Sequence, residues 1–66
     1  MTDEAKKREA MQRAAEFRQR AAQYDALSDE AKQRGDFELS SKFASSAAEE
    51  RNEARKIEDG VSKLGG

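Results

Sequence analysis

The sequence predicts an all-α protein, an antiparallel two-helix hairpin that pairs with a second copy into a four-helix bundle. Three observations predict this fold. Ala, Glu, Lys, Arg and Gln dominate, whereas β-branched residues are confined to Thr2, Ile57 and Val61. The chain contains no proline that would break a helix. One strong turn signal, Gly35-Asp36, divides the chain near its middle. Residues 1–66 are therefore expected to form one unit.

The first helix is expected over about residues 3–34. Thr2 or Asp3 can cap its start, and the negative charges of Asp3 and Glu4 suit the positive end of the helix dipole. Acid-then-base pairs spaced four residues apart favour helix in both halves of the chain. These pairs are Glu4–Arg8, Glu9–Arg13, Glu16–Arg20, Glu30–Arg34 and Glu38–Lys42.

The turn and the second helix follow from glycine and aspartate chemistry. Gly35 can adopt the left-handed conformation that ends a helix, and Asp36 can cap the next one. The second helix is expected over about residues 36–60, with Gly60 as its end and residues 61–66 as a frayed tail. A second helix that continues to residue 64 is one alternative, and a helix boundary at Ser28 is another.

A 3-4 alternation of apolar and small residues, here called the seam, runs through both halves. Folding the chain at Gly35-Asp36 places a large residue opposite a small one at successive levels, as close packing of two helices requires. The predicted pairs are Phe17–Ala54, Tyr24–Ala47, Ser28–Phe43, Ala14–Ile57 and Ala10–Val61. The complete seam is Ala10, Ala14, Phe17, Ala21, Tyr24, Ser28 and Ala31, then Ser40, Phe43, Ala47, Glu50, Ala54, Ile57, Val61 and Leu64.

Glu50 breaks the seam pattern, because a carboxylate stands opposite Ala21 where a large apolar residue is expected. One interpretation is a side chain that leans out to water, towards Arg18 or Arg20. The other is a polar group at a partner interface that fixes the register of the partners.

A second stripe of apolar and small residues flanks the seam, and a hairpin alone cannot cover both stripes. The stripe comprises Met11, Ala15, Ala22 and Ala26, then Phe37, Ser41, Ala44 and Ala48, with Leu27 and Leu39 near the bend. Twelve of the hydrophobic residues are alanine, so a lone hairpin buries little apolar surface. We therefore expect a homodimer, with a different protein over this stripe as the alternative.

The composition argues against catalysis and metal binding. The absence of Cys and His removes thiol nucleophiles, zinc-thiolate sites and the commonest general base near neutral pH. The carboxylates Glu49 and Glu53 alternate with Arg51 and Arg55, which is typical of a solvated face. We expect no enzyme activity and no cofactor. No apolar run approaches the length of a membrane span, so we expect a cytoplasmic protein without a membrane partner.

A basic cluster occupies the start of the first helix, where positive charge opposes the helix dipole. Either the acids of the second helix, among them Glu53 and Glu58, neutralise it across the hairpin, or it binds a nucleic-acid backbone or an acidic protein. The cluster comprises Lys6, Lys7, Arg8, Arg13, Arg18 and Arg20.

The stretch from Ala21 to Glu53 resembles a tetratricopeptide-type helical hairpin and the helical extension that precedes Smr domains. The resemblance covers about half the chain and implies a helical interaction module without catalytic residues. Ser40 and Ser41 depart from the tetratricopeptide pattern, which favours Ala there, and no second repeat follows. The matching residues are Tyr24, Leu27, Ala31, Arg34-Gly35-Asp36, Leu39, Phe43, Ala47 and the run Glu49-Glu50-Arg51-Asn52-Glu53.

The sequence thus predicts a small non-enzymatic protein-binding module, an adaptor or inhibitor of a larger protein machine, in the manner of phage-encoded inhibitors of host or defence proteins. The alternative is a dimeric bundle that binds RNA with the basic side of the first helix. The expected partner-binding residues are Lys7, Arg8, Met11, Arg13, Ala15, Arg18, Arg20, Ala22 and Glu50.

Overall fold

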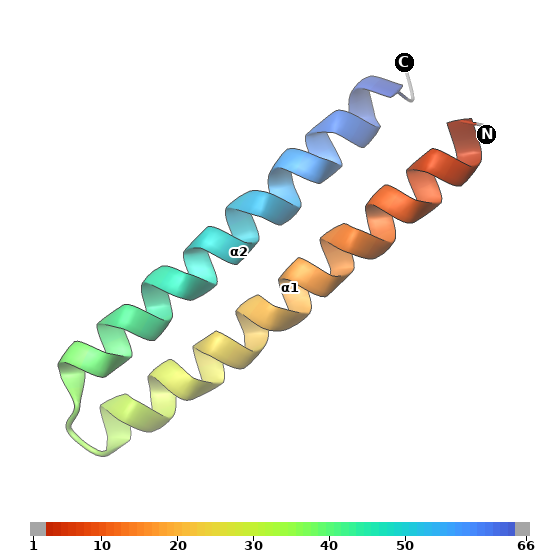
Figure 1. Ribbon diagram of the computed structural model, residues 1–66. Helices are drawn as coiled ribbons and strands as arrows, with labels where there is room; N and C mark the ends of the chain where they lie inside the picture. Colours follow the sequence, from red (N-terminus) through yellow and green to blue (C-terminus); the bar gives the residue numbers. More distant parts are fainter. Residues whose placement is uncertain (1–2, 65–66) are drawn as a thin grey trace.

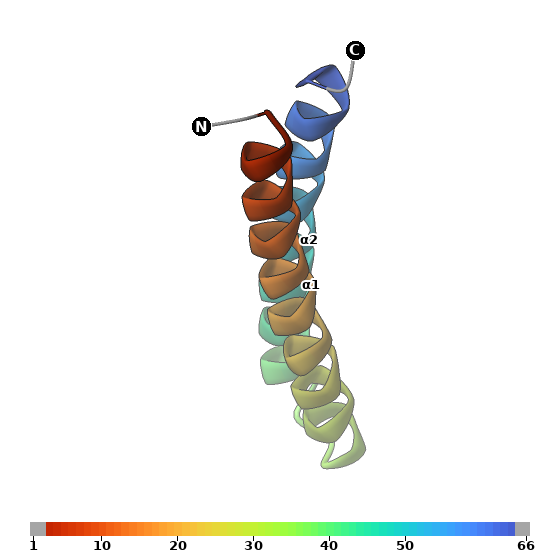
Figure 2. The same cartoon turned by 90° about the vertical axis from the view of Figure 1, so that its right-hand side faces the viewer.

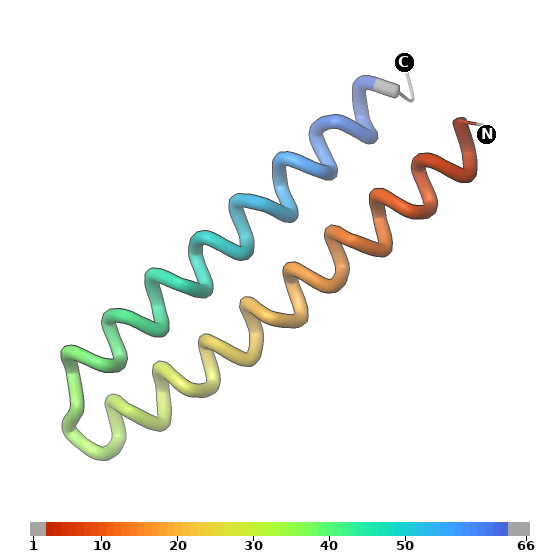
Figure 3. The backbone as a smooth tube through the Cα atoms, viewed as in Figure 1, coloured from red at the N-terminus to blue at the C-terminus, as the bar shows by residue number. Residues whose placement is uncertain are grey.

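The computed structural model describes residues 3–64, which form two long antiparallel helices and contain no strand. Helix α1 spans Asp3–Gln33 and helix α2 spans Phe37–Leu64. The chain reverses between them, so the two described ends lie side by side at the far end of the hairpin from the turn (Figures 1 and 3). The all-α hairpin predicted from the sequence is confirmed.

The turn is built by the two residues that the sequence marks for it. Gly35 has a φ of 84°, in the left-handed region. Its N–H donates to the carbonyl of Lys32 at 3.0 Å, and the N–H of Asp36 donates to that of Ala31 at 2.9 Å. These two bonds form a Schellman motif. The N–H of Leu39 then donates to Oδ1 of Asp36 at 3.1 Å, so Asp36 caps α2 as predicted.

The two helices lie against each other along their whole length, as the view in Figure 2 shows. Five residues are buried, and all are alanines of the seam: Ala14, Ala21, Ala31, Ala47 and Ala54. Every other seam residue whose side chain is described is half-buried. Within the described residues, no large side chain is fully buried. The hairpin therefore has a core of methyl groups, with its larger side chains beside that core.

Contacts near the turn involve two residues of the predicted pairs. Tyr24 stacks on Phe43, with ring centroids 6.2 Å apart, whereas Ala47 is its predicted partner. The hydroxyl of Ser28, for which Phe43 is the predicted partner, bonds to the carbonyl and the hydroxyl of Ser40, at 2.8 and 2.9 Å. Both contacts lie about one helical turn nearer the bend than predicted, because seam residues are offset from the helix–helix axis and reach diagonally to a neighbouring level.

Three predictions about helix ends can be compared with the structure. Helix α1 continues through Ser28, so the alternative boundary there is wrong. Helix α2 runs through Gly60 to Leu64, so the predicted end at Gly60 and the frayed tail are wrong for 61–64. Half-buried Val61 continues the seam and offsets the helix-interior cost of glycine, which is roughly 0.5–1 kcal/mol. Thr2 and residues 65–66 lie outside the described part of the chain.

The two described glycines should respond to alanine in opposite directions. A Cβ at either Gly35 or Gly60 would meet nothing within 4 Å, so only the backbone decides. We expect Gly35→Ala to destabilise the hairpin by about 1 kcal/mol, because alanine resists a positive φ. Gly60→Ala, in a regular helix, should stabilise it by roughly 0.5–1 kcal/mol. Urea unfolding followed by circular dichroism measures both, and equal shifts of one sign would contradict this account.

Candidate interaction surface

The seam divides its large and small residues between two sides of the hairpin. Successive residues of a helix are 100° apart, so residues seven apart nearly share a direction. Phe17 and Tyr24 share one such direction on α1, whereas Ala14 and Ala21 share another. On α2 the Tyr24–Phe43 contact places Phe43 on the side of the rings. The aromatic face, as we name it, comprises Phe17, Tyr24, Leu27, Leu39, Phe43 and Ile57.

Two rings of the aromatic face are in contact with each other, and all of its side chains remain partly exposed to solvent. The Tyr24 and Phe43 rings stack at an interplanar angle of 29°. The guanidinium of Arg20 lies 4.7 Å from the centre of the Phe17 ring, a cation–π contact. Leu27 remains 40% exposed, and Leu39 and Ile57 are half-buried. This face is an apolar strip that the hairpin itself covers only in part.

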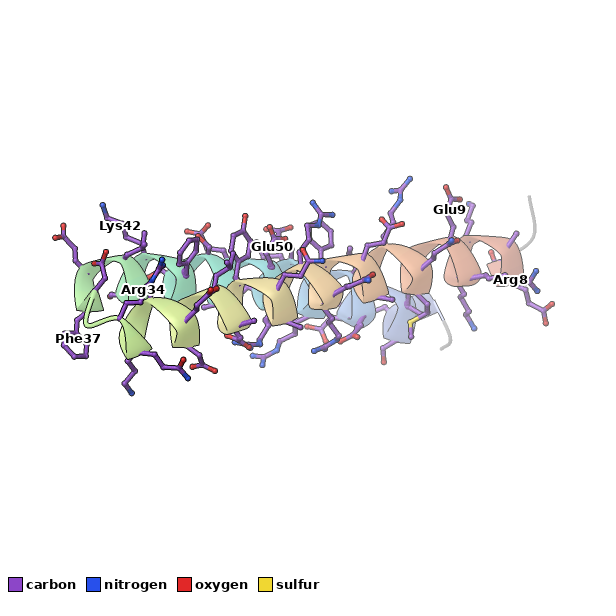
Figure 4. All side chains as sticks on the ribbon, turned by 90° about the horizontal axis from the view of Figure 1, so that it is seen from below. Arg8, Glu9, Arg34, Phe37, Lys42 and Glu50 are labelled. Atoms are coloured by element: carbon purple, nitrogen blue, oxygen red, sulfur yellow. The ribbon has the colours of Figure 1, made fainter. Side chains whose placement is uncertain are left out.

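Glu50 lies in the middle of this strip. It is half-buried, and among the described residues it makes no ion pair within 4 Å, either with Arg18 or with Arg20. Arg18 bonds to Glu58 and Arg20 stacks on Phe17 instead. In Figure 4 Glu50 projects from the same side of the hairpin as Lys42, opposite Phe37. A carboxylate thus stands unpaired within an apolar surface, which favours a cationic group from outside the hairpin.

The opposite side of the hairpin, which we name the alanine face, carries the second stripe predicted from the sequence. Its members are exposed, including Met11 at 49% and Phe37 at 66%. The alanines among them present little apolar area apiece, and the two large side chains stand near opposite ends of the molecule. The face comprises Met11, Ala15, Ala22, Ala26, Phe37, Ser41, Ala44 and Ala48.

Two interhelical ion pairs lie between the seam and the alanine face. Arg18 donates through Nε and Nη2 to the two carboxylate oxygens of Glu58, at 3.0 and 2.5 Å. Arg51 donates through Nη2 to Oδ2 of Asp25. The Arg18 hydrogen bonds hold the pKa of Glu58 below its ordinary value, and Arg55 adds a smaller effect in the same direction. The same hydrogen bonds raise the pKa of Arg18. Both ion pairs clamp the register of the helices.

The basic cluster is thus partly neutralised across the hairpin, as one interpretation of the sequence predicts. Arg18 pairs with Glu58, and Arg13 pairs with Glu9 within α1 at 3.3 Å. Of the five predicted intrahelical pairs, only Glu9–Arg13 lies within 4 Å among the described residues, while Lys56 pairs instead with Glu53 at 3.4 Å. Arg20 stacks on Phe17 instead of pairing with Glu16, and the residues of the other three pairs are exposed, where such contacts are weak.

The structure does not bring the predicted partner-binding residues together on one surface. Arg13, Arg20 and Glu50 lie along the aromatic face, whereas Lys7 is half-buried on the seam side of α1. The sequence reasoning missed the rings as surface residues, because their 3-4 spacing equally suits a covered core. The missed signal is that each ring of the seam stands three or four residues from a seam alanine, so rings and methyl groups lie on different sides. The residues on or beside the alanine face are Arg8, Met11, Ala15, Arg18 and Ala22.

The described residues offer little else that resembles a functional site. Two shallow surface hollows are lined by α1 alone and mainly by polar side chains, the larger of the two by Glu16, Gln19, Arg20 and Gln23. No group of three or more potential metal ligands occurs between residues 3 and 64. Neither helix, over that same range, is long and apolar enough to cross a membrane.

Comparison with known proteins adds no relative: no family model, no curated protein and no solved structure matches this chain. The resemblance to tetratricopeptide-type hairpins and to Smr extensions therefore stays a prediction.

The Arg18–Glu58 pair predicts a pH response that a single substitution removes. We expect Arg18→Gln to raise the pKa of Glu58 most of the way to that of an ordinary carboxyl, with Arg55 retaining the remainder. Because the folded pKa of Glu58 is lowered, the stabilisation is present above the unfolded pKa and is lost as pH falls through the folded value. Arg18→Gln should therefore reduce the loss of stability on acidification.

Carboxyl ¹³C NMR titration measures this pKa directly. Arg51→Gln is the matched control, because it breaks the Asp25 pair and leaves the Glu58 pair in place. An unchanged Glu58 titration in Arg18→Gln would show that the pair does not hold in solution.

Proposed function

We propose that the protein is a small, non-enzymatic cytoplasmic module that acts by binding other proteins, as an adaptor or an inhibitor of a larger assembly, through its aromatic face. The observation that carries this proposal is the placement of the large apolar side chains. Alanines fill the interior, and the rings and leucines form a partly exposed strip outside it. Burying large apolar side chains supplies most of the stabilisation in protein association.

The shape of the strip suits a helical partner. The aromatic face runs along the shallow surface between the antiparallel helices α1 and α2. A third helix can lie there and place its own apolar residues between α1 and α2. Aromatic residues and arginine are the types most enriched at energetically important interface positions. Arg20 over Phe17 and the Tyr24–Phe43 stack supply both.

RNA binding, the competing proposal, has weaker support. Two of the arginines that would contact phosphates, Arg13 and Arg18, already pair with carboxylates. Tyr24 and Phe43 stack on each other and are half-buried, so neither offers a free ring to a base. The formal net charge of the chain is −1, without the excess of positive charge that drives binding to a phosphate backbone.

Affinity capture from an extract of the source cells, with a face-specific pair of variants, tests the proposal. Leu27→Glu combined with Leu39→Glu places charge on the aromatic face without disturbing a fully buried residue. The control is Phe37→Glu on the alanine face. We expect the native chain and the control to retain the same protein in stoichiometric amounts, and the double variant to retain it at least tenfold less.

Two outcomes would count against the proposal. Capture that disappears on nuclease treatment, together with a mobility shift of RNA that weakens steeply with salt, would favour the nucleic-acid function. Equal capture by the double variant and the native chain would remove the aromatic face from the binding surface. Circular dichroism of all three chains verifies that the hairpin is intact.

A further inference from the structure

We propose that the aromatic face binds a second copy of this chain, with the two turns at the same end and α1 of each copy lying on α2 of the other. This inference rests on the proposed function, because it requires the aromatic face to bind protein, and it names the occupant and its orientation. The product is a four-helix bundle in which every neighbouring pair of helices is antiparallel.

The size of the face suits a symmetric dimer. The hairpin measures 50 × 14 × 12 Å. One broad side therefore offers on the order of 700 Å² before side chains are counted, close to the roughly 800 Å² per partner that stable interfaces bury. A second copy would bring its own rings and leucines to the same strip and cover both.

Two rows of exposed residues border the aromatic face on its outer edges; the α1 row is acidic apart from Gln23, and the α2 row is basic apart from Glu49. Each row repeats every seven residues and so keeps one direction along its helix. In Figure 4 one member of each row, Glu9 and Lys42, projects from the same side of the hairpin. The α1 row is Glu9, Glu16, Gln23 and Glu30. The α2 row is Lys42, Glu49, Lys56 and Lys63.

The rows match level by level. The ion pairs Arg18–Glu58 and Asp25–Arg51 on one side of the hairpin and the contacts Tyr24–Phe43 and Ser28–Ser40 on the other are displaced in opposite directions along the axis. Midway between these two sets of contacts, Glu30 stands at about the level of Lys42. Glu16 stands likewise at the level of Lys56. Within one hairpin the rows point away from each other from opposite edges, so these charges cannot meet. With the second copy placed as proposed, the α1 row of each chain lies on the α2 row of the other and acid faces base.

The charges also select the orientation. If the second copy were turned end to end, α1 would lie on α1 and α2 on α2. Acidic residues would then face acidic residues along one edge, and Lys42 would face Lys56 of the other copy along the other. Like charges placed opposite one another are destabilising and discriminate against that arrangement.

Glu50 and Arg20 fit the same orientation. Glu50 is half-buried without an ion pair, and it stands nearly level with Arg20 of α1. In the proposed dimer Arg20 of the second copy reaches the apolar strip beside Glu50. The carboxylate that breaks the seam then acts as a registry element at the interface, one of the two roles that the sequence leaves open.

Charge reversal in separate chains tests the contact. Glu30→Lys and Lys42→Glu should each weaken the dimer roughly tenfold in dissociation constant, because each places like charges opposite one another twice. An equimolar mixture of the two variants should recover native affinity, because the heterodimer has an acid facing a base at both sites. Sedimentation equilibrium measures all three samples against the 7.4 kDa of one chain.

Recovery on mixing is decisive, because neither Glu30–Arg34 nor Glu38–Lys42 interactions within one chain can produce it. A mixture no stronger than its components overturns the proposed pairing. The double variant Glu30→Lys with Lys42→Glu in one chain should also associate natively. Asp29→Lys, exposed but outside the rows, is the matched control for charge alone and should leave the affinity unchanged.

A distance measurement tests the orientation separately. The chain has no cysteine, so a single cysteine at Glu38 can carry a spin label near the turn. The proposed dimer places the two labels at the same level, within about 30 Å across the bundle, whereas an end-to-end dimer with Lys42 facing Lys56 adds a separation of about 33 Å along the axis at 1.5 Å per residue. Pulsed electron resonance distinguishes the two, and the longer distance overturns the orientation.

The outcomes separate this inference from the proposed function. If the protein is a monomer at millimolar concentration and still captures another protein through the aromatic face, the proposed dimer is overturned and the proposed function stands. A dimer with the expected charge response that captures no other protein supports the inference and removes the adaptor role.

Discussion

The close approach of α1 and α2 is the constraint on which the rest of the structure depends. Where two helices pack through alanines, their backbones come closer than bulky side chains permit, and no space remains between them for a ring. Ala14, Ala21, Ala47 and Ala54 impose this approach over the length of the hairpin. The rings must then lie beside the contact rather than within it. An apolar strip along one side of the molecule is thus a direct consequence of the alanine interior.

Polar contacts fix the hairpin in one register, which the alanine interior alone would leave loosely determined. A methyl group packs about equally well one turn further along, so alanines carry little information about alignment. The turn supplies alignment at one end through Gly35 and Asp36. The Ser28–Ser40 hydroxyl contact and the Arg18–Glu58 pair extend it along the helices. These contacts lie where water is partly excluded or where a bidentate geometry is formed, so each carries directional information.

The hairpin and the residues that line its seam could be predicted from the sequence. Glycine and aspartate chemistry at 35 and 36 has few alternatives, and a 3-4 repeat places a residue on one side of a helix regardless of its partner. Individual partners were harder, as Tyr24 and Phe43 show, since two rings can meet diagonally whenever their neighbours are small. The end of α2 is predicted at Gly60, and the alternative that continues to residue 64 is the one observed, because the seam contact of Val61 outweighs the cost of a glycine within a helix. The aromatic face could not be predicted from the 3-4 repeat, because the repeat does not show that the rings and the methyl groups of the seam lie on different sides of the hairpin.

The alanine interior also shapes how the isolated hairpin should respond to temperature. Heat capacity rises on unfolding in proportion to the apolar surface newly exposed to water, at about 12–15 cal/mol/K per residue in ordinary domains. Five buried methyl groups and a set of rings already half in water leave little such surface to expose. The free energy of unfolding of a single hairpin therefore varies with temperature along a shallow curve, and its thermal transition is broad. If a partner covers the rings, the stability curve becomes more strongly curved and the thermal transition becomes sharper. Calorimetry therefore reports whether the aromatic face is occupied.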